Sequence, residues 1–118
     1  MNSSIVNLHE VQDQLGLDDD TIKELYLVFV EDIKVERQNI EENLLSGNLE
    51  RLEKSTHTVK GIAGNYHALK VYEHAVQCDM RFKQRDYENM DGNMSVLLGL
   101  IDEVIEQLYA YFQWEQTG

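Results

Sequence analysis

The chain lacks proline, and Cys78 is its single cysteine among 118 residues. Proline breaks helix interiors, so its absence leaves long helices uninterrupted. A lone cysteine excludes an internal disulfide, and we expect a reducing, cytoplasmic setting. The sequence contains neither a run of about 18 apolar residues that would predict a membrane-spanning helix nor a basic-then-apolar start that would predict a secretory signal. These absences favour a helical domain without a membrane-spanning helix.

Basic residues are also scarce, with 10 Lys and Arg against 22 Asp and Glu and a net charge of −12. This balance argues against a nucleic-acid partner. The segment from Lys54 to Arg85 holds six basic and two acidic residues, a balance of +4, whereas the rest holds four basic and twenty acidic residues, a balance of −16. The basic minority therefore gathers around His57, unless it is an ordinary scatter of solvated charges.

Apolar residues recur at helical spacing along nearly the whole chain. The pattern predicts a short helix between Asn7 and Gly16, then four long helices over about 21–46, 49–66, 69–80 and 94–111. Four long amphipathic helices with short connections predict an all-α fold, an antiparallel four-helix bundle whose one end the short N-terminal helix covers. We expect a single domain over residues 1–118 with its core at about 5–112.

Local signals mark the ends of these helices. Asn7 and Asn48 are predicted N-caps, and Thr21 is predicted to start the second helix in a capping box with Glu24. Gly16 and Gly47 are predicted stops. The segment "DYENMDGN" is read as a loop or a loose helix start.

The apolar seams follow from the same spacing. In the second helix the seam is Ile22, Leu25, Phe29, Ile33, Ile40 and Leu44, and in the third it is Leu49, Leu52, Thr56, Val59, Ala63 and Tyr66. In the fourth it is Leu69, Tyr72, Val76 and Met80, and in the fifth it is Met94, Leu97, Ile101, Val104, Leu108 and Tyr111. Cys78 is interpreted as a small buried filler, and Tyr111 and Trp114 as packing at the C-terminal end. Leu27, Val28 and Val30 are interpreted either as buried under the first helix or as a docking surface.

His57 lies one residue, about 100°, beyond the seam of the third helix. Its face also carries Lys60, Gly61 and Gly64, three, four and seven residues on. Each mid-helix glycine costs about 0.5–1 kcal/mol relative to alanine. Two glycines beside one histidine suggest that a large partner, such as a protein surface, approaches this face. The alternatives are an ordinary surface histidine and glycines that serve helix–helix contacts.

Imidazole is among the side chains that form covalent intermediates. If His57 accepts a phosphoryl group, the product is strongly negative, and Lys60 one turn away supplies a charge-assisted partner. His67, His74, Cys78 and Asp79 have no standard zinc-site spacing, so we expect no metal.

The stretch "HTVKGIAG", with Ala68 eleven residues after His57, resembles the histidine-containing phosphotransfer (HPt) domain of bacterial two-component phosphorelays. The resemblance extends upstream through "LGLDDDTIKELYLVFVEDI" and "LLSGNLERLEKSTHTVKG" and covers residues 5–112. It implies a phosphocarrier rather than an enzyme, without a cofactor of its own. Such a domain takes a phosphoryl group from a receiver-domain aspartate and passes it to another receiver, which brings the Mg²⁺. The implied partners are receiver domains of response regulators or of a hybrid histidine kinase.

The resemblance also implies roles for particular residues. His57 matches the phosphorylated histidine, Lys60 matches the lysine that helps to hold the phosphoryl group, and Gly61 matches the glycine that leaves room for the receiver. Asp79 stands where the family often has Glu or Gln beside the histidine, and it is expected to orient the imidazole. Lys83 adds positive charge near the docking face.

The chain departs from the family at the end of the third helix. His67 stands where the family usually has glycine, and Tyr66 where it has an aliphatic residue. Gly64 completes the expected docking face.

Two other classes remain open. One is a helical interaction module that carries no phosphate. The other is the dimerising histidine domain of a sensor kinase, which is disfavoured because no proline follows His57 and no ATP-binding region follows in this chain. We expect a monomer, and the initial methionine favours a free-standing protein over an excised domain.

Overall fold

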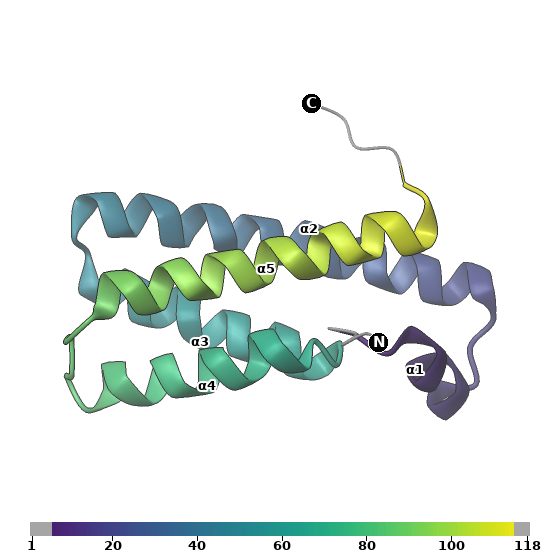
Figure 1. Cartoon of the computed structure of the whole chain (residues 1–118), viewed down its shortest axis with the longest axis horizontal. Coiled ribbons are helices and arrows are strands. Elements are labelled where there is room, and N and C mark those ends of the chain that lie inside the picture. The colour runs from purple at the N-terminus through teal and green to yellow at the C-terminus, as the bar shows by residue number, and fades with distance from the viewer. Residues whose placement is uncertain (1–5, 115–118) are drawn as a thin grey trace.

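The computed structural model describes residues 6–114 and contains five α-helices and no strand in that range (Figure 1). They are α1 (Leu8–Leu15), α2 (Asp19–Ser46), α3 (Leu49–Asn65), α4 (Leu69–Lys83) and α5 (Met90–Phe112). The protein is therefore all-helical, as the sequence predicts. None of these helices is both long enough and apolar enough to cross a membrane.

Most helix ends lie where the local signals place them. Asn7 Oδ1 accepts a hydrogen bond from the Glu10 amide (3.1 Å), and Asn48 Oδ1 accepts one from the Arg51 amide (3.1 Å). Gly16 and Gly47 end α1 and α2 in the left-handed region, with φ of 65° and 71°. Glycine adopts this conformation without a Cβ penalty, which explains both stops.

The predicted start of α2 is wrong. Asp18 is the N-cap, because its Oδ1 accepts a hydrogen bond from the Thr21 amide at 2.8 Å. Hydrogen bonds from the Thr21 side chain and, to a smaller extent, from the Thr21 amide lower the pKa of Asp18. Thr21 therefore lies inside the first turn instead of capping it. An aspartate and a threonine both suit an N-cap, and here the first of three consecutive aspartates occupies the position.

The four long helices pack as a closed ring. α3 contacts α2 and α4, and α5 contacts the other side of α2 and α4 (Figure 1). Side chains join the helices at specific points: Tyr26 donates a hydrogen bond to the Tyr66 carbonyl oxygen (2.7 Å), and Arg37 forms a two-point pair with Asp102 (2.6 and 2.8 Å). The ring surrounds one apolar core to which all five helices contribute.

The predicted seams of α3 and α5 form this core. Leu52, Thr56, Val59 and Ala63 are fully buried in α3. Met94, Leu97, Ile101, Val104 and Leu108 are buried in α5, and the predicted filler Cys78 is buried in α4. These positions are confirmed. The single apolar stripe of α3 leaves one choice of buried face, whereas in α5 the seam is the buried centre of a wider apolar face whose flanks, such as Leu98 and Ile105, are partly buried.

The predicted seam of α4 is wrong. The buried apolar residues are instead Val71, Ala75, Cys78 and Phe82. Leu69 and Met80 are 58% and 54% exposed, Tyr72 is 38% exposed, and Val76 is half-buried. The helix carries two apolar stripes, each with helical spacing, which are offset from each other by about one residue. The stripe with the smaller side chains, which starts at Val71, faces the core. Small residues let a helix approach its neighbours closely, so the stripe with the larger side chains need not be the buried one.

Three smaller corrections concern exposed apolar residues. Leu25 in the predicted seam of α2 is exposed, and its neighbour Tyr26 is buried instead. Leu27 and Val28 are exposed, so only Val30 meets the expectation of burial.

The C-terminal end of α5 carries an aromatic cluster. Trp114 stacks on Phe112 with ring centroids 4.9 Å apart, as its predicted packing requires. The prediction that Tyr111 belongs to the buried seam of α5 is wrong, because Tyr111 is exposed; its ring makes edge contacts with the rings of His9 and Phe112.

The end of α3 is strained at His67. This residue has φ of 61°, and the amides of His67 and Ala68 close the helix through the carbonyls of Gly64 and Ala63 (3.4 and 2.9 Å). This Schellman-type ending normally places glycine at the left-handed position, where a side chain costs about 1–2 kcal/mol.

Replacing His67 by glycine should therefore stabilise the protein. We expect His67→Gly to raise the free energy of unfolding by about 1 kcal/mol in urea denaturation. His67→Ala is the matched control, because alanine retains the Cβ atom and should give no such gain. Equal effects of the two substitutions would contradict this explanation.

Candidate functional site

His57 projects from α3 into solvent. Its side chain is 61% exposed, whereas the neighbouring residues of the seam, Thr56 and Val59, are fully buried. The burial of these two residues fixes the rotation of α3, so a side chain one position beyond Thr56 must lie outside the core. The structure thus places the imidazole where its position in the sequence predicts.

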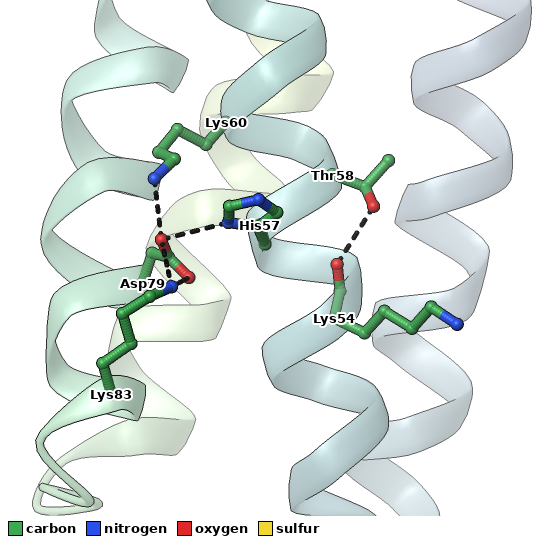
Figure 2. Close-up of polar contacts among 6 residues, drawn as sticks. All are labelled: Lys54, His57, Thr58, Lys60, Asp79 and Lys83. Carbon is green, nitrogen blue, oxygen red and sulfur yellow. Dashed lines mark hydrogen bonds and ion pairs between the residues drawn. The ribbon is translucent and has the colours of Figure 1, made fainter.

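Asp79 brings a carboxylate from α4 to the imidazole. Asp79 Oδ2 lies 3.3 Å from His57 Nδ1, across the line where α3 and α4 pack (Figure 2). The Asp79 side chain is only 3% exposed, because it lies at the edge of the buried face of α4. A buried charge is stable only when it is paired, so the surroundings of this carboxylate are decisive.

Two lysines satisfy the carboxylate. Lys60, one turn after His57 on α3, donates a hydrogen bond to Asp79 Oδ2 at 2.8 Å. Lys83, one turn after Asp79 on α4, donates to Oδ1 at 3.0 Å and to Oδ2 at 2.9 Å. Figure 2 shows all three nitrogen groups converging on Asp79. The structure therefore brings together the four residues that the sequence singled out from two separate helices.

These contacts determine the charge of Asp79. Burial by itself raises the pKa of this carboxyl, but the hydrogen bonds from Lys60, Lys83 and His57 outweigh burial and lower the pKa to about 2. Asp79 is accordingly ionised at neutral pH. With two ammonium groups beside one carboxylate, the surroundings of the imidazole carry an excess of positive charge.

The ionised carboxylate also selects the proton position on His57. A carboxylate only accepts hydrogen bonds, so the ring nitrogen that faces it, Nδ1, carries the hydrogen. In the neutral ring the lone pair then lies on Nε2. Within residues 6–114 no group forms a hydrogen bond with Nε2, and the exposed ring presents this nitrogen as a nucleophile.

The two glycines beside His57 have different surroundings. A Cβ atom added at Gly61 would meet no atom within 4 Å, so no helix–helix contact within the described chain requires this glycine. A Cβ atom added at Gly64 would lie 3.2 Å from the Tyr72 ring of α4. Gly64 is thus explained by close packing inside the protein, whereas Gly61 leaves an open patch of helix next to the imidazole.

Other residues near this segment do not join the site. Lys54 and Thr58 lie on the side of α3 nearer α2, where Thr58 Oγ1 donates to the Lys54 carbonyl oxygen at 3.0 Å (Figure 2). His74 Nε2 lies 2.8 Å from the Asn93 carbonyl oxygen, which ties α4 to α5. Over the described part of the chain, no group of three or more His, Cys, Asp and Glu residues is placed to hold a metal ion.

Sequence reasoning missed Tyr72 as a neighbour of the site, because it assigned this residue to the core. The signal was present in the spacing: Tyr72, Val76, Asp79 and Lys83 recur at intervals of four, three and four residues. A residue that shares its side of α4 with Asp79 and Lys83 must lie close to α3, and Tyr72 does so at Gly64, two turns beyond His57.

Comparisons with protein-family models, with curated proteins and with solved structures found no match to this chain. The function must therefore be argued from the site itself. Chemically, the site offers an exposed nucleophilic nitrogen, a fixed proton on the other ring nitrogen, two nearby ammonium groups and an uncovered helix surface.

Replacing Asp79 by asparagine should remove a pH-dependent contribution to stability. A carboxyl whose pKa falls from its ordinary 3.8 to about 2 on folding stabilises the native state by about 2 kcal/mol above pH 4. That contribution should decrease as the pH falls through the range from about 4 to about 2, because the unfolded chain binds the proton first.

The measurement is urea denaturation of wild type and Asp79→Asn between pH 6 and pH 3. The difference in unfolding free energy should be largest at pH 6 and about 1 kcal/mol smaller at pH 3. Asp102→Asn is the control, because it removes a carboxylate from a more exposed ion pair, the one with Arg37. A difference for Asp79→Asn that does not change with pH would contradict the ionised, lysine-paired state.

Proposed function

We propose that the protein is a phosphorelay intermediate of the HPt type, which accepts a phosphoryl group on His57 from a receiver-domain aspartate and passes it to another receiver domain. One observation carries this proposal: an exposed imidazole has its Nδ1 beside a buried carboxylate that also holds two lysines. An ordinary surface histidine needs no such support. The resemblance of "HTVKGIAG" to the HPt family supports the same function.

The transfer step follows from the proton position on the ring. The Nε2 lone pair attacks the phosphorus of the receiver's aspartyl phosphate, and a P–N bond forms. The P–O bond to the aspartate breaks, and its electron pair returns to the receiver's carboxylate. The hydrogen stays on Nδ1, where Asp79 stabilises the positive charge that the ring gains. The reverse sequence loads the next receiver.

The two lysines are suited to the product. A phosphoryl group on His57 carries close to two negative charges. Lys60 and Lys83 are flexible side chains, 29% and 56% exposed, and their ammonium groups lie within one hydrogen bond of the carboxylate beside the ring. They can turn toward a phosphoryl group without a change in the helices. Lys60 thus stabilises the phosphoryl group, and Lys83 adds charge at the docking face.

The fold is suited to a carrier of this kind. The ring of contacts among α2, α3, α4 and α5 supports the antiparallel four-helix arrangement expected from the short connections. In this proposal the receiver supplies Mg²⁺ and most of the catalytic groups. The protein itself acts as a cytoplasmic, monomeric phosphocarrier rather than as an enzyme.

The decisive variant is His57→Ala. We expect wild type to acquire acid-labile, base-stable label from a phosphorylated receiver domain of the same organism, and His57→Ala to acquire none. Label that persists in His57→Ala would refute the proposal. His57→Gln distinguishes the phosphate-free interaction module, because that module predicts unchanged partner binding together with unchanged downstream signalling in this variant.

A second prediction concerns the open patch at Gly61. Gly61→Gln should increase stability by about 0.5 kcal/mol, because the side chain meets no neighbour and glutamine favours helix. The same side chain should block receiver-dependent transfer by occupying the space above the helix. Stopped-flow or gel-based transfer assays measure the effect.

Gly99→Gln is the matched control. Gly99 is also an exposed glycine inside a helix with no atom within 4 Å of an added Cβ, but it lies on α5, which packs against α2 and α4. This variant should gain similar stability and keep the wild-type transfer rate. Unchanged transfer in Gly61→Gln would show that partners do not dock over this patch.

A further inference from the structure

The outer side of α4 carries an apolar stripe formed by Leu69, Tyr72, Val76 and Met80, which we call the α4 stripe. Leu69 and Met80 are more than half exposed, Tyr72 is 38% exposed, and Val76 is half-buried. Their spacing is that of a buried helix seam, yet within residues 6–114 the other helices cover it only in part. An apolar face of this length on a surface helix is typical of a docking surface.

The α4 stripe is continuous with the site at His57. Tyr72 packs its ring against Gly64, the last glycine of the α3 face that carries the imidazole. At its other end, Met80 directly follows Asp79 in the chain, and Asp79 contacts His57. The stripe and the His57 face therefore border each other along the packing line of α3 and α4, which lies at the edge of the bundle (Figure 1).

The charges around the stripe indicate what kind of surface it fits. The stripe lies wholly within the segment from Lys54 to Arg85, whose balance is +4, whereas the rest of the chain has a balance of −16. Lys70 and Lys83 lie at its two ends, and Arg81 follows Met80. The exposed apolar residues of α2, by contrast, have acidic neighbours: Val28 lies near Glu31 and Asp32. An acidic partner is attracted to the first surface and repelled by the second.

We propose that the α4 stripe is half of the partner-binding surface, so that the receiver domain that exchanges phosphate with His57 also contacts Leu69, Tyr72 and Met80. The matching face of that receiver is apolar and has acidic side chains at its rim. This inference rests on the proposed function. It adds that α4 selects the partner through apolar contact, whereas α3 carries the chemistry.

The test uses the paired substitution Leu69→Gln/Met80→Gln, at exposed positions where folding should be unaffected. The probe is the receiver domain that transfers most rapidly to His57 in a panel from the same organism. We expect the paired variant to raise KM for this receiver at least about tenfold and to change kcat little, since outlying contacts contribute binding rather than chemistry. Val35→Gln on α2, at a 58% exposed position, is the control and should leave KM unchanged.

Labelling of His57 by phosphoramidate, a small donor that needs no docking, separates this inference from the proposed function. Wild type and the paired variant should be labelled at the same rate. Loss of that labelling in wild type would refute the function, whereas an unchanged KM in the paired variant would overturn the inference alone.

Binding measured by NMR gives an answer that does not depend on transfer. Titrating ¹⁵N-labelled His57→Gln protein with each receiver of the panel should shift amide signals over residues 69–80, more weakly at high salt. The inference is overturned if no receiver shifts these signals. It is also overturned if the signals shift with the concentration of the protein alone, because the stripe would then bind a second copy of the chain.

Discussion

A buried carboxylate without hydrogen-bond partners would destabilise this protein. Asp79 is buried, and the candidate site consists of the groups that pair with it. Its two oxygens accept hydrogen bonds from one imidazole nitrogen and two ammonium groups on α3 and α4. The bonds from His57 and Lys60 join α3 to α4, and the carboxylate determines which nitrogen of His57 carries the hydrogen. The same contacts therefore have two effects. They offset the cost of burying the Asp79 carboxylate between α3 and α4, and they orient the exposed imidazole of His57.

The surface around this interaction divides into parts with different tasks. α3 presents the reactive ring and a patch without side chains at Gly61, and α4 presents lysine charge and exposed apolar area. The remainder of the chain is acidic, so a partner of the proposed kind would be repelled from the other faces. In the proposed function, selectivity would come from the partner's fit to this surface rather than from the enclosure of a small ligand.

Sequence reasoning located His57 on the outer face because α3 has a single apolar stripe. Once that stripe is buried, the residue next to Thr56 must lie outside the core. It found Asp79 through a resemblance and Lys83 through its position one turn after Asp79. It did not find that Lys60 and Lys83 share one carboxylate, since this depends on how α4 is rotated. That rotation was wrong in the prediction because Leu69–Met80 and Val71–Phe82 are two stripes of nearly equal spacing. Packing of small residues against neighbouring helices decides between them, and no single-helix pattern contains that information.

The two glycines of α3 are subject to different evolutionary constraints. The Tyr72 ring limits the size of the side chain at position 64, so a larger residue there becomes acceptable once the residue at position 72 is smaller. Gly61 has no such neighbour within the described chain, so within that chain nothing limits the size of the side chain at this position. Among descendants of this protein, position 64 should therefore co-vary with position 72, whereas only a partner of the proposed kind would restrict changes at position 61.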